Sequence, residues 1–268
     1  MTDEDRYELL GEIGRGAGGV IYRARDRDLG RDVAFKLLRR EGSTLDARVR
    51  FVAEAQIPAQ LEHPNIIPIH DVGRTRDGSL FYVMKLVQGQ TLKEHLNGRT
   101  SRSELLFAML QVARGIAFAH HRGVIHRDLK PSNVMIGLFG EVLILDWGLA
   151  RPTRGLSTAR DEHGGTMTLD GDVLGSLGYM APEQARGEVH RQGPPTDVHA
   201  FGGVLYELLT GRPPRHSRTL GELIPRLNEL PEPAPGPLGA LASRCLAPEP
   251  GARPQSGEEL LALLERVT

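Results

Sequence analysis

A short polar run and the acidic tripeptide that follows it constrain this chain more than any other feature. The run is HRDLKPSN, at His126–Asn133, and after twelve further residues comes DWG, at Asp146–Gly148. An acid, a lysine and an amide thus occur in a fixed short order, and a second acid follows the apolar segment 142–145. Together, such side chains can move a phosphoryl group, because they supply a proton acceptor, a positive charge and hard oxygen ligands. If they act together, the fold has to bring them into one site.

Each polar side chain has a candidate role in such a reaction. Asp128 is expected to accept a hydroxyl proton, and Lys130 to neutralise charge on the transferred phosphoryl group. Asn133 and Asp146 are expected to bind Mg²⁺, or Mn²⁺ in its place, through oxygen atoms. The pattern H-R-D-L-x-x-x-N, with D-x-G after it, resembles the eukaryotic-type protein kinases. With lysine at position 130 the motif resembles that of the serine/threonine-specific protein kinases. The residues around it resemble those of a bacterial subgroup of these kinases.

The composition limits the class of protein. The 268 residues are 40% apolar and 25% charged, as is ordinary for a globular chain with one large domain or two lobes. A net charge of -1 gives no field to gather nucleic acid, and no apolar run approaches the roughly 18 residues that span a bilayer. The start lacks the features of a signal peptide, and the single Cys245 cannot form an internal disulfide. We expect a cytoplasmic protein, or the cytosolic domain of a longer one, with no nucleic-acid partner and no membrane segment.

The order of the hydrophobic patterns predicts two lobes. Strand patterns and one helical pattern come first, the strands at 7–13, 20–25, 32–38, 66–72 and 80–84, the helix at 44–61. Helical patterns dominate afterwards, at 91–96, 103–121, 198–209, 239–246 and 257–267, with short strands at 134–136 and 141–145. The resemblance implies an α+β, protein-kinase-like bilobal fold in a single domain over 1–268. Its small antiparallel N-lobe would occupy about 7–86, and its mainly helical C-lobe about 90–268.

Two further expectations concern the long helical pattern at 103–121. Ser103 opens the pattern and is expected to cap the helix. Apolar residues at helical spacing are expected on its buried face, namely Leu106, Leu110, Ala113 and Ala117.

A glycine-rich segment near the N-terminus is the candidate phosphate loop. It matches G-x-G-x-x-G-x-V through Gly14, Gly16 and Gly19, with Ile21 at the valine position. Glycine lets backbone N–H groups approach a phosphate without a side chain in the way. The motif alone is weak, because dinucleotide-binding proteins share it and a plain hairpin turn also uses glycine. Those proteins place a helix directly after the loop, whereas here a strand pattern follows and then VAFK, at 33–36, which favours a nucleotide-binding role.

Lys36, at the end of VAFK, is the candidate ligand of the α- and β-phosphates of ATP. A lysine inside a strand needs a partner for its charge, and the resemblance implies Glu54. A solvated helix face is the alternative for Glu54, and Glu62 is its nearest competitor. Pro58 departs from the family, which has an apolar residue one turn after that glutamate. Since proline removes a backbone hydrogen bond, we expect a kinked helix and a Lys36–Glu54 pair that is looser or depends on a partner.

The resemblance also implies an apolar pocket for adenine. Met84 corresponds to the gatekeeper of that pocket, and the backbone of Lys85 and Val87 would bond the edge of the base. The side chains that would line the pocket are Ile13, Ile21, Ala34, Met84 and Met135. Ordinary core packing is the alternative, and for Ile13 and Met135 the sequence does not separate the two.

Three neighbours of the candidate catalytic residues have other expected roles. Arg127 would face a phosphorylated residue of the activation loop, and His126 would be a hydrogen-bonded core histidine without a chemical role. Trp147 replaces the phenylalanine that the family has at this position. Its indole is expected to fill the same apolar slot and to need a partner for its N–H, which would change loop flexibility and not chemistry.

The segment from Asp146 to Glu183 resembles an activation segment that ends in G-T-x-x-Y-x-A-P-E. It contains a long polar, glycine-rich stretch at 154–172, whose length indicates a functional or mobile loop. Ser176 occupies the threonine position of the motif. Its hydroxyl is expected to bond Asp128 and Lys130 and to shape the substrate site.

Regulation and scaffolding have candidate residues as well. Thr166 and Thr168 are candidate phosphorylation sites whose phosphates would dock on Arg127, and plain flexible-loop hydroxyls are the alternative. The resemblance implies a buried structural pair between Glu183 and Arg253. It also implies that Asp197 holds the catalytic loop through its backbone.

These signals support one main interpretation and two alternatives. The main one is an ATP-dependent serine/threonine protein kinase that phosphorylates hydroxyls of proteins and autophosphorylates in trans through self-association. The second is a pseudokinase that acts as a nucleotide-binding scaffold or regulator, and its only support is Pro58 and Trp147. The third is a small-molecule kinase of the same fold, which the segment 176–183 disfavours because it resembles a platform for protein substrates.

Overall fold

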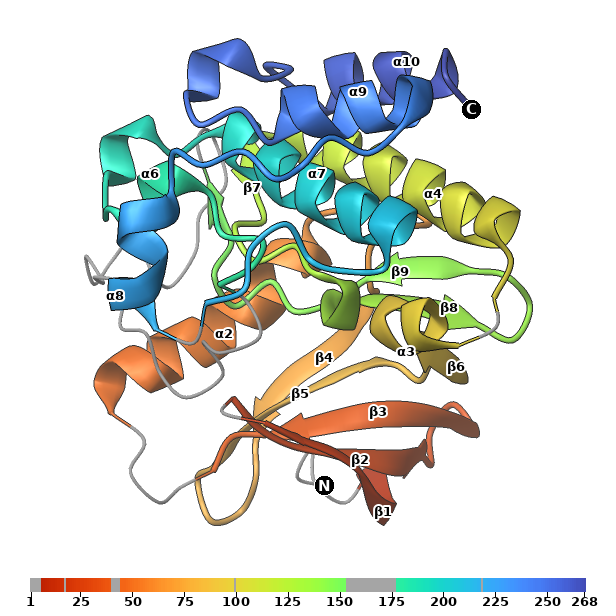
Figure 1. Ribbon diagram of the computed structural model, residues 1–268. Coiled ribbons are helices and arrows are strands. Elements are labelled where there is room, and N and C mark those ends of the chain that lie inside the picture. The colour runs from red at the N-terminus through yellow and green to blue at the C-terminus, as the bar shows by residue number, and fades with distance from the viewer. Residues whose placement is uncertain (1–5, 17, 40–43, 99, 153–176, 218) are drawn as a thin grey trace.

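The computed structural model describes residues 6–16, 18–39, 44–98, 100–152, 177–217 and 219–268. The first third of the chain forms an antiparallel sheet with one helix beside it, and the rest forms a larger, mainly helical body (Figure 1). The fold is therefore α+β, as the sequence predicted. Within the described ranges, no helix is both long enough and apolar enough to cross a membrane.

Five strands form the main sheet in the order β1-β2-β3-β5-β4, and all neighbouring strands are antiparallel. Their bounds are Tyr7–Gly16 for β1, Gly19–Asp26 for β2, Arg31–Leu37 for β3, Ile69–Arg74 for β4 and Leu80–Lys85 for β5. Phe35 and Phe81 stack across β3 and β5 with ring centroids 4.5 Å apart, and Tyr7 packs against both rings. This aromatic cluster stabilises the sheet by burying large apolar surfaces on one face.

Helix α2, Leu45–Ala59, connects β3 to β4 and packs against β4 and β5. Thr44 caps its first turn through the side-chain oxygen. Phe51 of α2 packs on Tyr82 of β5, with ring centroids 5.0 Å apart. The helix continues through Pro58 and ends one residue later, so the proline lies in the last turn, where it removes a single helical hydrogen bond.

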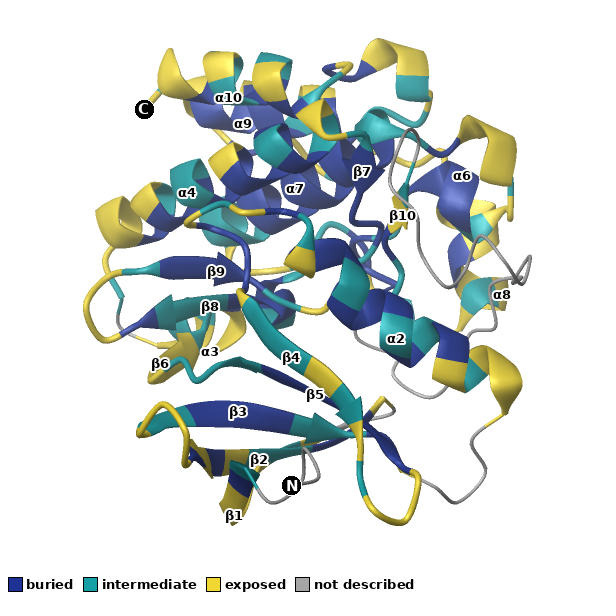
Figure 2. Ribbon diagram, turned by 180° about the vertical axis from the view of Figure 1, so that it is seen from behind, coloured by how far each residue is buried: buried dark blue, intermediate teal, exposed yellow. Residues whose placement is uncertain are grey.

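Helices α4 and α7 form the centre of the helical body, and α9 and α10 lie against them (Figure 1). The bounds are Leu92–Asn97 for α3, Arg102–His121 for α4, Pro182–Ala185 for α6, Pro194–Thr210 for α7, Leu220–Leu223 for α8, Gly236–Cys245 for α9 and Gly257–Glu265 for α10. One continuous core runs through this body and includes the fully buried Met109, Ile116 and Phe201 (Figure 2). Helix α7 ends where Gly211 adopts φ 73°, a left-handed conformation that glycine tolerates.

Short strands bring the two polar segments of the sequence together. Strands β6, Gly89–Thr91, β8, Val134–Gly137, and β9, Val142–Ile144, form one antiparallel sheet, and β7, Val124–Ile125, pairs with β10, Arg151–Pro152. Strand β7 leads into the HRDLKPSN run, and β9 leads into DWG. The Leu145 N–H donates to the Asn133 carbonyl at 2.8 Å, so the ends of the two segments lie side by side.

The structure corrects two details that the sequence led us to expect for α4. Its N-cap is Ser101 and not Ser103: the Ser101 hydroxyl accepts from the Glu104 N–H at 3.3 Å, and the Glu104 carboxylate accepts from the Ser101 N–H at 2.9 Å. This S-x-x-E capping box satisfies two backbone donors at once, which explains why the helix begins earlier than expected. The buried face is also rotated, because Leu106 and Leu110 are only partly buried. The buried residues of the helix are Leu105, Ala108, Met109, Val112, Ala113, Gly115, Ile116, Ala117 and Ala119.

Candidate active site

Lys36 and Glu54 form an ion pair where the sheet meets α2. Lys36 lies on β3, the central strand, and its ammonium group donates to Oε1 of Glu54. The two side chains are only 12% and 8% exposed, whereas Glu62 is exposed. The structure thus places Glu54, and not Glu62, against Lys36. The pair is formed with Pro58 present, so the proline does not prevent it.

The charges of this pair depend on each other. Burial lowers the pKa of Lys36, but attraction to Glu54 and Asp146 outweighs burial and raises that pKa overall. Burial raises the pKa of Glu54, and the neighbouring Lys36 opposes this change. The lysine therefore stays protonated and can present its charge to a phosphate, while the glutamate holds it in place.

The glycine-rich segment forms the turn of the β1–β2 hairpin, in which Gly16 pairs with Gly19. Gly19 has φ 139°, and a Cβ there would lie 2.3 Å from the Leu37 carbonyl oxygen. A Cβ at Gly18 would lie 3.2 Å from Nζ of Lys36. Glycine at position 19 therefore lets the hairpin lie against the backbone of β3, and this brings Gly18 close to Lys36, where a phosphate is expected to bind.

Two of the expected adenine contacts are neighbours in the sheet. Ala34 of β3 pairs with Met84 of β5. The next residue, Lys85, donates its N–H to the Pro68 carbonyl at 3.1 Å, so its carbonyl, and not its N–H, is the group expected to bond a base. Ala34 and Met84 thus lie next to each other, as a shared pocket requires.

The other residues expected to contact adenine come from several different parts of the chain. Ile21 pairs with Gly14 across the hairpin, Met135 is partly buried on β8, and Val87 packs against the helical core. Ile13 is 53% exposed on β1. Ile13 is therefore not a core residue, which was the alternative considered for it. Its exposed side chain is available to cover a base.

Asp128, Lys130 and Asn133 converge in the loop after β7. Nζ of Lys130 lies 2.9 Å from Oδ2 of Asp128. The Asn133 amide donates to the Asp128 carbonyl at 2.8 Å and to its Oδ2 at 3.1 Å. Burial raises the pKa of Asp128, with Lys130 opposing the change and Asp146 reinforcing it. A carboxylate that is held by two donors and has a raised pKa is well suited to accept a hydroxyl proton.

Asp146 faces the same site from the segment after β9. Burial raises its pKa, but attraction to Lys36, Lys130 and His126 outweighs burial and lowers that pKa overall. The carboxylate is therefore ionised at neutral pH. Because it interacts with lysines from both the sheet and the catalytic loop, the early and late parts of the sequence share one site.

Backbone conformation also distinguishes this site. Among the described residues, Arg127 and Asp146 are the two non-glycine residues with positive φ, at 70° and 52°. Such conformations are sparsely populated and persist where the surrounding structure enforces them, often at functional sites. At Gly148 a Cβ would lie 3.5 Å from Oε2 of Glu54, so the DWG turn lies close to α2.

Asp197, on α7, holds the start of the catalytic loop, as expected. Its carboxylate accepts hydrogen bonds from the backbone N–H groups of His126 and Arg127, each at 2.7 Å. His120, on α4, donates from Nε2 to the same carboxylate at 2.9 Å, and its Nδ1 accepts from the Gly257 N–H at 2.9 Å. Sequence reasoning missed His120, because a histidine near the end of a helix carries no signal of a partner 77 positions away.

His126 and Trp147 match their expected structural roles. His126 is fully buried, donates from Nε2 to the Leu145 carbonyl at 3.0 Å and accepts at Nδ1 from the Asp128 N–H at 3.2 Å. Trp147 is 1% exposed, and its indole N–H donates to the Ile144 carbonyl at 3.4 Å. The two rings meet edge to face with centroids 4.6 Å apart. The indole therefore fills an apolar slot behind the catalytic loop.

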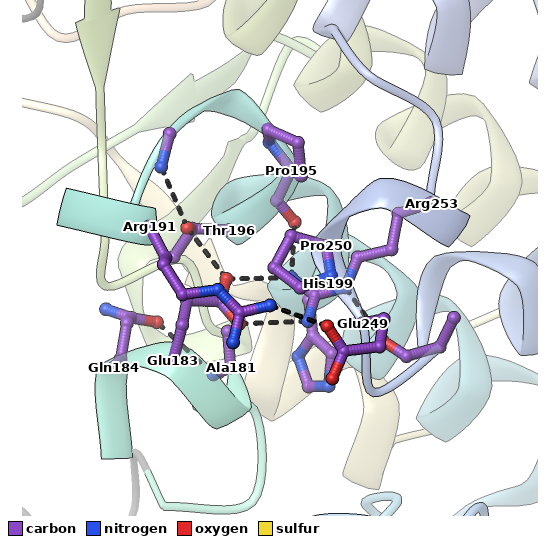
Figure 3. Close-up of polar contacts among 12 residues, drawn as sticks. Ala181, Glu183, Gln184, Arg191, Pro195, Thr196, His199, Glu249, Pro250 and Arg253 are labelled. Atoms are coloured by element: carbon purple, nitrogen blue, oxygen red, sulfur yellow. Dashed lines mark hydrogen bonds and ion pairs between the residues drawn. The ribbon is translucent and has the colours of Figure 1, made fainter. Parts of the chain in front are cut away.

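Glu183 and Arg253 form the buried ion pair that the sequence predicted (Figure 3). Nη1 and Nη2 of Arg253 donate to Oε1 and Oε2 of Glu183 at 2.8 and 2.9 Å. The Thr196 hydroxyl donates to the same Glu183 at 2.9 Å. Gln184, which sequence reasoning missed, donates to the Arg127 carbonyl at 2.8 Å. The segment at α6 is thus fixed both to the C-terminal part of the body and to the catalytic loop.

The expected regulatory residues Thr166, Thr168 and Ser176 lie outside the described residues. Arg127, the expected docking partner of phosphates on Thr166 and Thr168, is 9% exposed. The Arg127 N–H donates to Asp197, and the Arg127 carbonyl accepts from Gln184. These two contacts position the Arg127 backbone.

Asn133 and Asp146 provide a donor set that fits a divalent cation such as Mg²⁺ or Mn²⁺. An ionised carboxylate and an amide oxygen are the hard ligands that such cations prefer. No cluster of three or more His, Cys, Asp and Glu side chains suited to a metal ion is found in the part of the chain that the structure describes. The expected site has a different composition, because phosphate oxygens would supply further ligands beside one carboxylate and one amide.

Comparison with known proteins agrees with this geometry. The family described as protein kinase domain matches residues 7–260. The chain is 41% identical to the serine/threonine-protein kinase PrkC of Bacillus subtilis over 212 residues, which cover 78% of this chain and 31% of PrkC. It is 34% identical to the serine/threonine-protein kinase PknD of Chlamydia muridarum over 296 residues, covering 97% of this chain and 31% of PknD.

A third relative shows the same relationship. The chain is 40% identical over 220 residues to a protein of Bifidobacterium longum named probable serine/threonine-protein kinase PknB, covering 78% of this chain and 31% of PknB. The chain thus spans less than a third of the length of these relatives.

Proposed function

The chain belongs to the protein kinase domain family, and on that premise we propose that it transfers the γ-phosphate of ATP to serine or threonine hydroxyls of proteins. One observation carries this proposal: the DWG turn, with Asp146, lies against the Lys36–Glu54 pair, and the charge of Asp146 acts on both Lys36 and Asp128, although these residues come from β3 and from two later loops. The similarity to bacterial proteins named as serine/threonine-protein kinases supports the same activity.

Each residue of the site has a step in the proposed reaction. Lys36 binds phosphate oxygens, and Glu54 holds its ammonium group in place. Asp128 orients the incoming hydroxyl and accepts its proton as the new bond to phosphorus forms. Lys130, 2.9 Å from that carboxylate, stabilises negative charge on the transferred group. The glycine hairpin covers the phosphates with backbone N–H groups.

Asn133 and Asp146 are the proposed ligands of Mg²⁺ or Mn²⁺. When bound, the cation would neutralise charge on the phosphates. The amide nitrogen of Asn133 donates to Asp128, so its oxygen is the atom proposed to face the cation. Asp146 has a lowered pKa, which keeps its carboxylate ionised and able to bind the cation.

Self-association in trans is the proposed route to autophosphorylation. Thr166 and Thr168 are the proposed acceptor hydroxyls, and their phosphates would dock on Arg127. Ser176 is proposed to bond Asp128 and Lys130 and to shape the substrate site. Protein substrates are favoured over small molecules because the sequence of the segment 176–183 resembles a platform for protein substrates.

The two residues that supported the pseudokinase interpretation leave the described site intact. Pro58 is accommodated in the last turn of α2, and Trp147 is buried with its N–H bonded. We therefore prefer an active enzyme to a nucleotide-binding scaffold.

The test is transfer of ³²P from labelled ATP to the protein itself and to a generic basic protein, beside the variant Asp128→Asn. We expect label on serine and threonine with the wild type, dependent on Mg²⁺ or Mn²⁺, and loss of nearly all of it in the variant. Equal label in the two proteins, with nucleotide binding intact in both, would contradict the proposal and favour the pseudokinase.

A further inference from the structure

Tyr82 is a buried polar side chain to which the proposed reaction gives no role. It lies on β5 and is 3% exposed. Its hydroxyl donates a hydrogen bond of 2.6 Å to Oε1 of Glu54, the same oxygen that Lys36 contacts. A single carboxylate oxygen thus receives both the catalytic lysine and the tyrosine.

The ring of Tyr82 contacts α2, as the hydroxyl does, and also contacts Lys36 of β3. Its centroid lies 5.0 Å from that of Phe51, one turn before Glu54 on α2. Nζ of Lys36 lies over the ring, 5.5 Å from the centroid, within the range of a cation–π interaction. Tyr82 therefore contacts the lysine, the glutamate and the helix that carries the glutamate.

The backbone of Glu54 lacks one hydrogen bond that a helix interior normally provides. Because Pro58 has no N–H, the Glu54 carbonyl cannot accept the helical hydrogen bond from that position. Its carboxylate is buried, which by itself favours the neutral form, and the charge of Asp146 acts in the same direction. The hydrogen bond from Tyr82 and the charge of Lys36 act in the opposite direction, toward the ionised carboxylate.

We propose that Tyr82 is a positioning residue of the kinase reaction: its hydroxyl fixes the Glu54 carboxylate and so aligns Lys36 for phosphate. The inference rests on the proposed function, since alignment of Lys36 matters to catalysis only if the protein transfers phosphate. The competing explanation is that Tyr82 only fills space between α2 and the sheet. The two explanations differ in one respect: positioning acts through the hydroxyl and needs Glu54, whereas packing acts through the ring and does not.

The chain offers a matched control for loss of the hydroxyl. Tyr7, on β1 of the same sheet, is 5% exposed and donates from its hydroxyl to Oδ2 of Asp71 at 2.8 Å. Tyr7→Phe therefore deletes a partly buried tyrosine–carboxylate hydrogen bond away from Lys36. Tyr82→Phe deletes the corresponding bond at the site and keeps the ring.

The first measurement is a double-mutant cycle of Tyr82→Phe and Glu54→Ala, which removes the acceptor oxygen, with kcat and KM for ATP measured for each variant. Tyr82→Phe is expected to lower kcat/KM by roughly tenfold, as for loss of a hydrogen bond to a charged group. In the Glu54→Ala background, where Tyr82 has no carboxylate to bond, the same change is expected to have an effect of no more than about twofold. Tyr7→Phe is expected to stay within about twofold of the wild type. An equal loss from Tyr82→Phe in both backgrounds, or no more loss than from Tyr7→Phe, would overturn the proposal.

The second measurement does not require turnover. Brief treatment with acetic anhydride, followed by mass spectrometry, gives the reactivity of Lys36 relative to the exposed Lys93. Tyr82→Phe is expected to raise that ratio, because a less firmly held Glu54 protects the ammonium less, and Tyr7→Phe is expected to leave it unchanged. An unchanged ratio in Tyr82→Phe contradicts the positioning role. If the wild type transfers no phosphate, the proposed function fails, whereas this ratio still tests the link between Tyr82 and Lys36.

Discussion

Asp197 and His120, on different helices, share a hydrogen bond of 2.9 Å between two side chains that are at most 1% exposed. The same carboxylate accepts from two backbone N–H groups of the catalytic loop. The loop that carries Asp128 is therefore anchored to the centre of the helical body, and its conformation, with a positive φ at Arg127, depends on this anchor.

Replacement of Asp197 by Asn should damage both stability and activity. The amide keeps the shape but loses the charge, and its NH₂ group cannot accept the bonds that the carboxylate oxygens accept. We expect a loss of about 2–4 kcal/mol in the free energy of unfolding, and at least a tenfold lower kcat with a smaller change in KM for ATP. Urea unfolding and steady-state kinetics measure the two effects. A fully active variant would show that the loop holds its conformation without this anchor.

The stability that Asp197 contributes should depend on pH in one direction. Burial raises the pKa of Asp197, but the hydrogen bond from His120, with smaller contributions from His126 and the Arg127 N–H, outweighs burial and holds it below the ordinary 3.8. A carboxyl group with a lowered folded-state pKa stabilises the protein above its unfolded pKa and loses that contribution as the pH falls. The difference in unfolding free energy between wild type and Asp197→Asn should therefore be constant near neutral pH and shrink below about pH 4. Urea titrations at several pH values test this, and a difference that grows in acid would refute it.

The glycine hairpin should tolerate alanine at one position and not at another. Gly19 has φ 139°, and a Cβ there would lie 2.3 Å from the Leu37 carbonyl oxygen, whereas a Cβ at Gly11 meets nothing within 4 Å. Gly19→Ala is expected to cost about 1–3 kcal/mol from backbone strain alone and to raise KM for ATP. Gly11→Ala, the control on the neighbouring strand β1, should leave the KM for ATP unchanged. Equal behaviour of the two variants would mean that the close approach of Gly19 to the Leu37 carbonyl does not matter to ATP binding.

The ion pair between Glu183 and Arg253 should matter far more than a surface pair of similar length. Glu183→Gln leaves a guanidinium group buried without its counter-charge, which typically costs about 3–5 kcal/mol. Arg244 and Glu259 are also 2.8 Å apart, but their side chains are 46% and 39% exposed. Arg244→Met should therefore cost no more than about 1 kcal/mol. Thermal and urea unfolding distinguish the two, and similar losses would mean that burial is not what makes the first pair important.

Pro58 should limit how firmly α2 holds Glu54. Pro58→Leu restores an N–H that can donate to the Glu54 carbonyl, so we expect a higher melting temperature, by about 2–4 °C for each kcal/mol gained, and a higher kcat/KM with an altered dependence on metal concentration. Calorimetry and kinetics at several Mg²⁺ concentrations provide the measurement. If the magnitude and metal dependence of activity are both unchanged, Pro58 does not influence the Lys36–Glu54 pair.

Much of the site was accessible from the sequence because its residues lie in short, ordered motifs. HRDLKPSN and DWG identified Asp128, Asn133 and Asp146, and the structure brings them together with Lys36. Periodicity also identified the strands of the sheet and most helices. It misplaced the cap of α4, where the S-x-x-E capping box at Ser101 was present but overlooked.

The contacts that hold these motifs in place were less accessible. His120, Gln184 and Tyr82 each bond a residue of the site from 28 to 77 positions away. Nothing near them in the sequence marks a partner, because histidine, glutamine and tyrosine are common in ordinary helices and strands. They acquire a role only in the folded protein, because each is a buried donor that needs an acceptor and has one within reach.

The sequence alone determined which chemical groups are present and which of them occur at fixed short spacings, because side-chain type and local periodicity are properties of the chain itself. The tertiary structure decided which distant groups meet, that Glu54 rather than Glu62 faces Lys36, and that Tyr82 shares its carboxylate. The physical reason is that burial raises the cost of an unpaired charge or donor, so each such group requires a partner. Which partner it finds is set by how helices and strands pack, and not by distance along the chain.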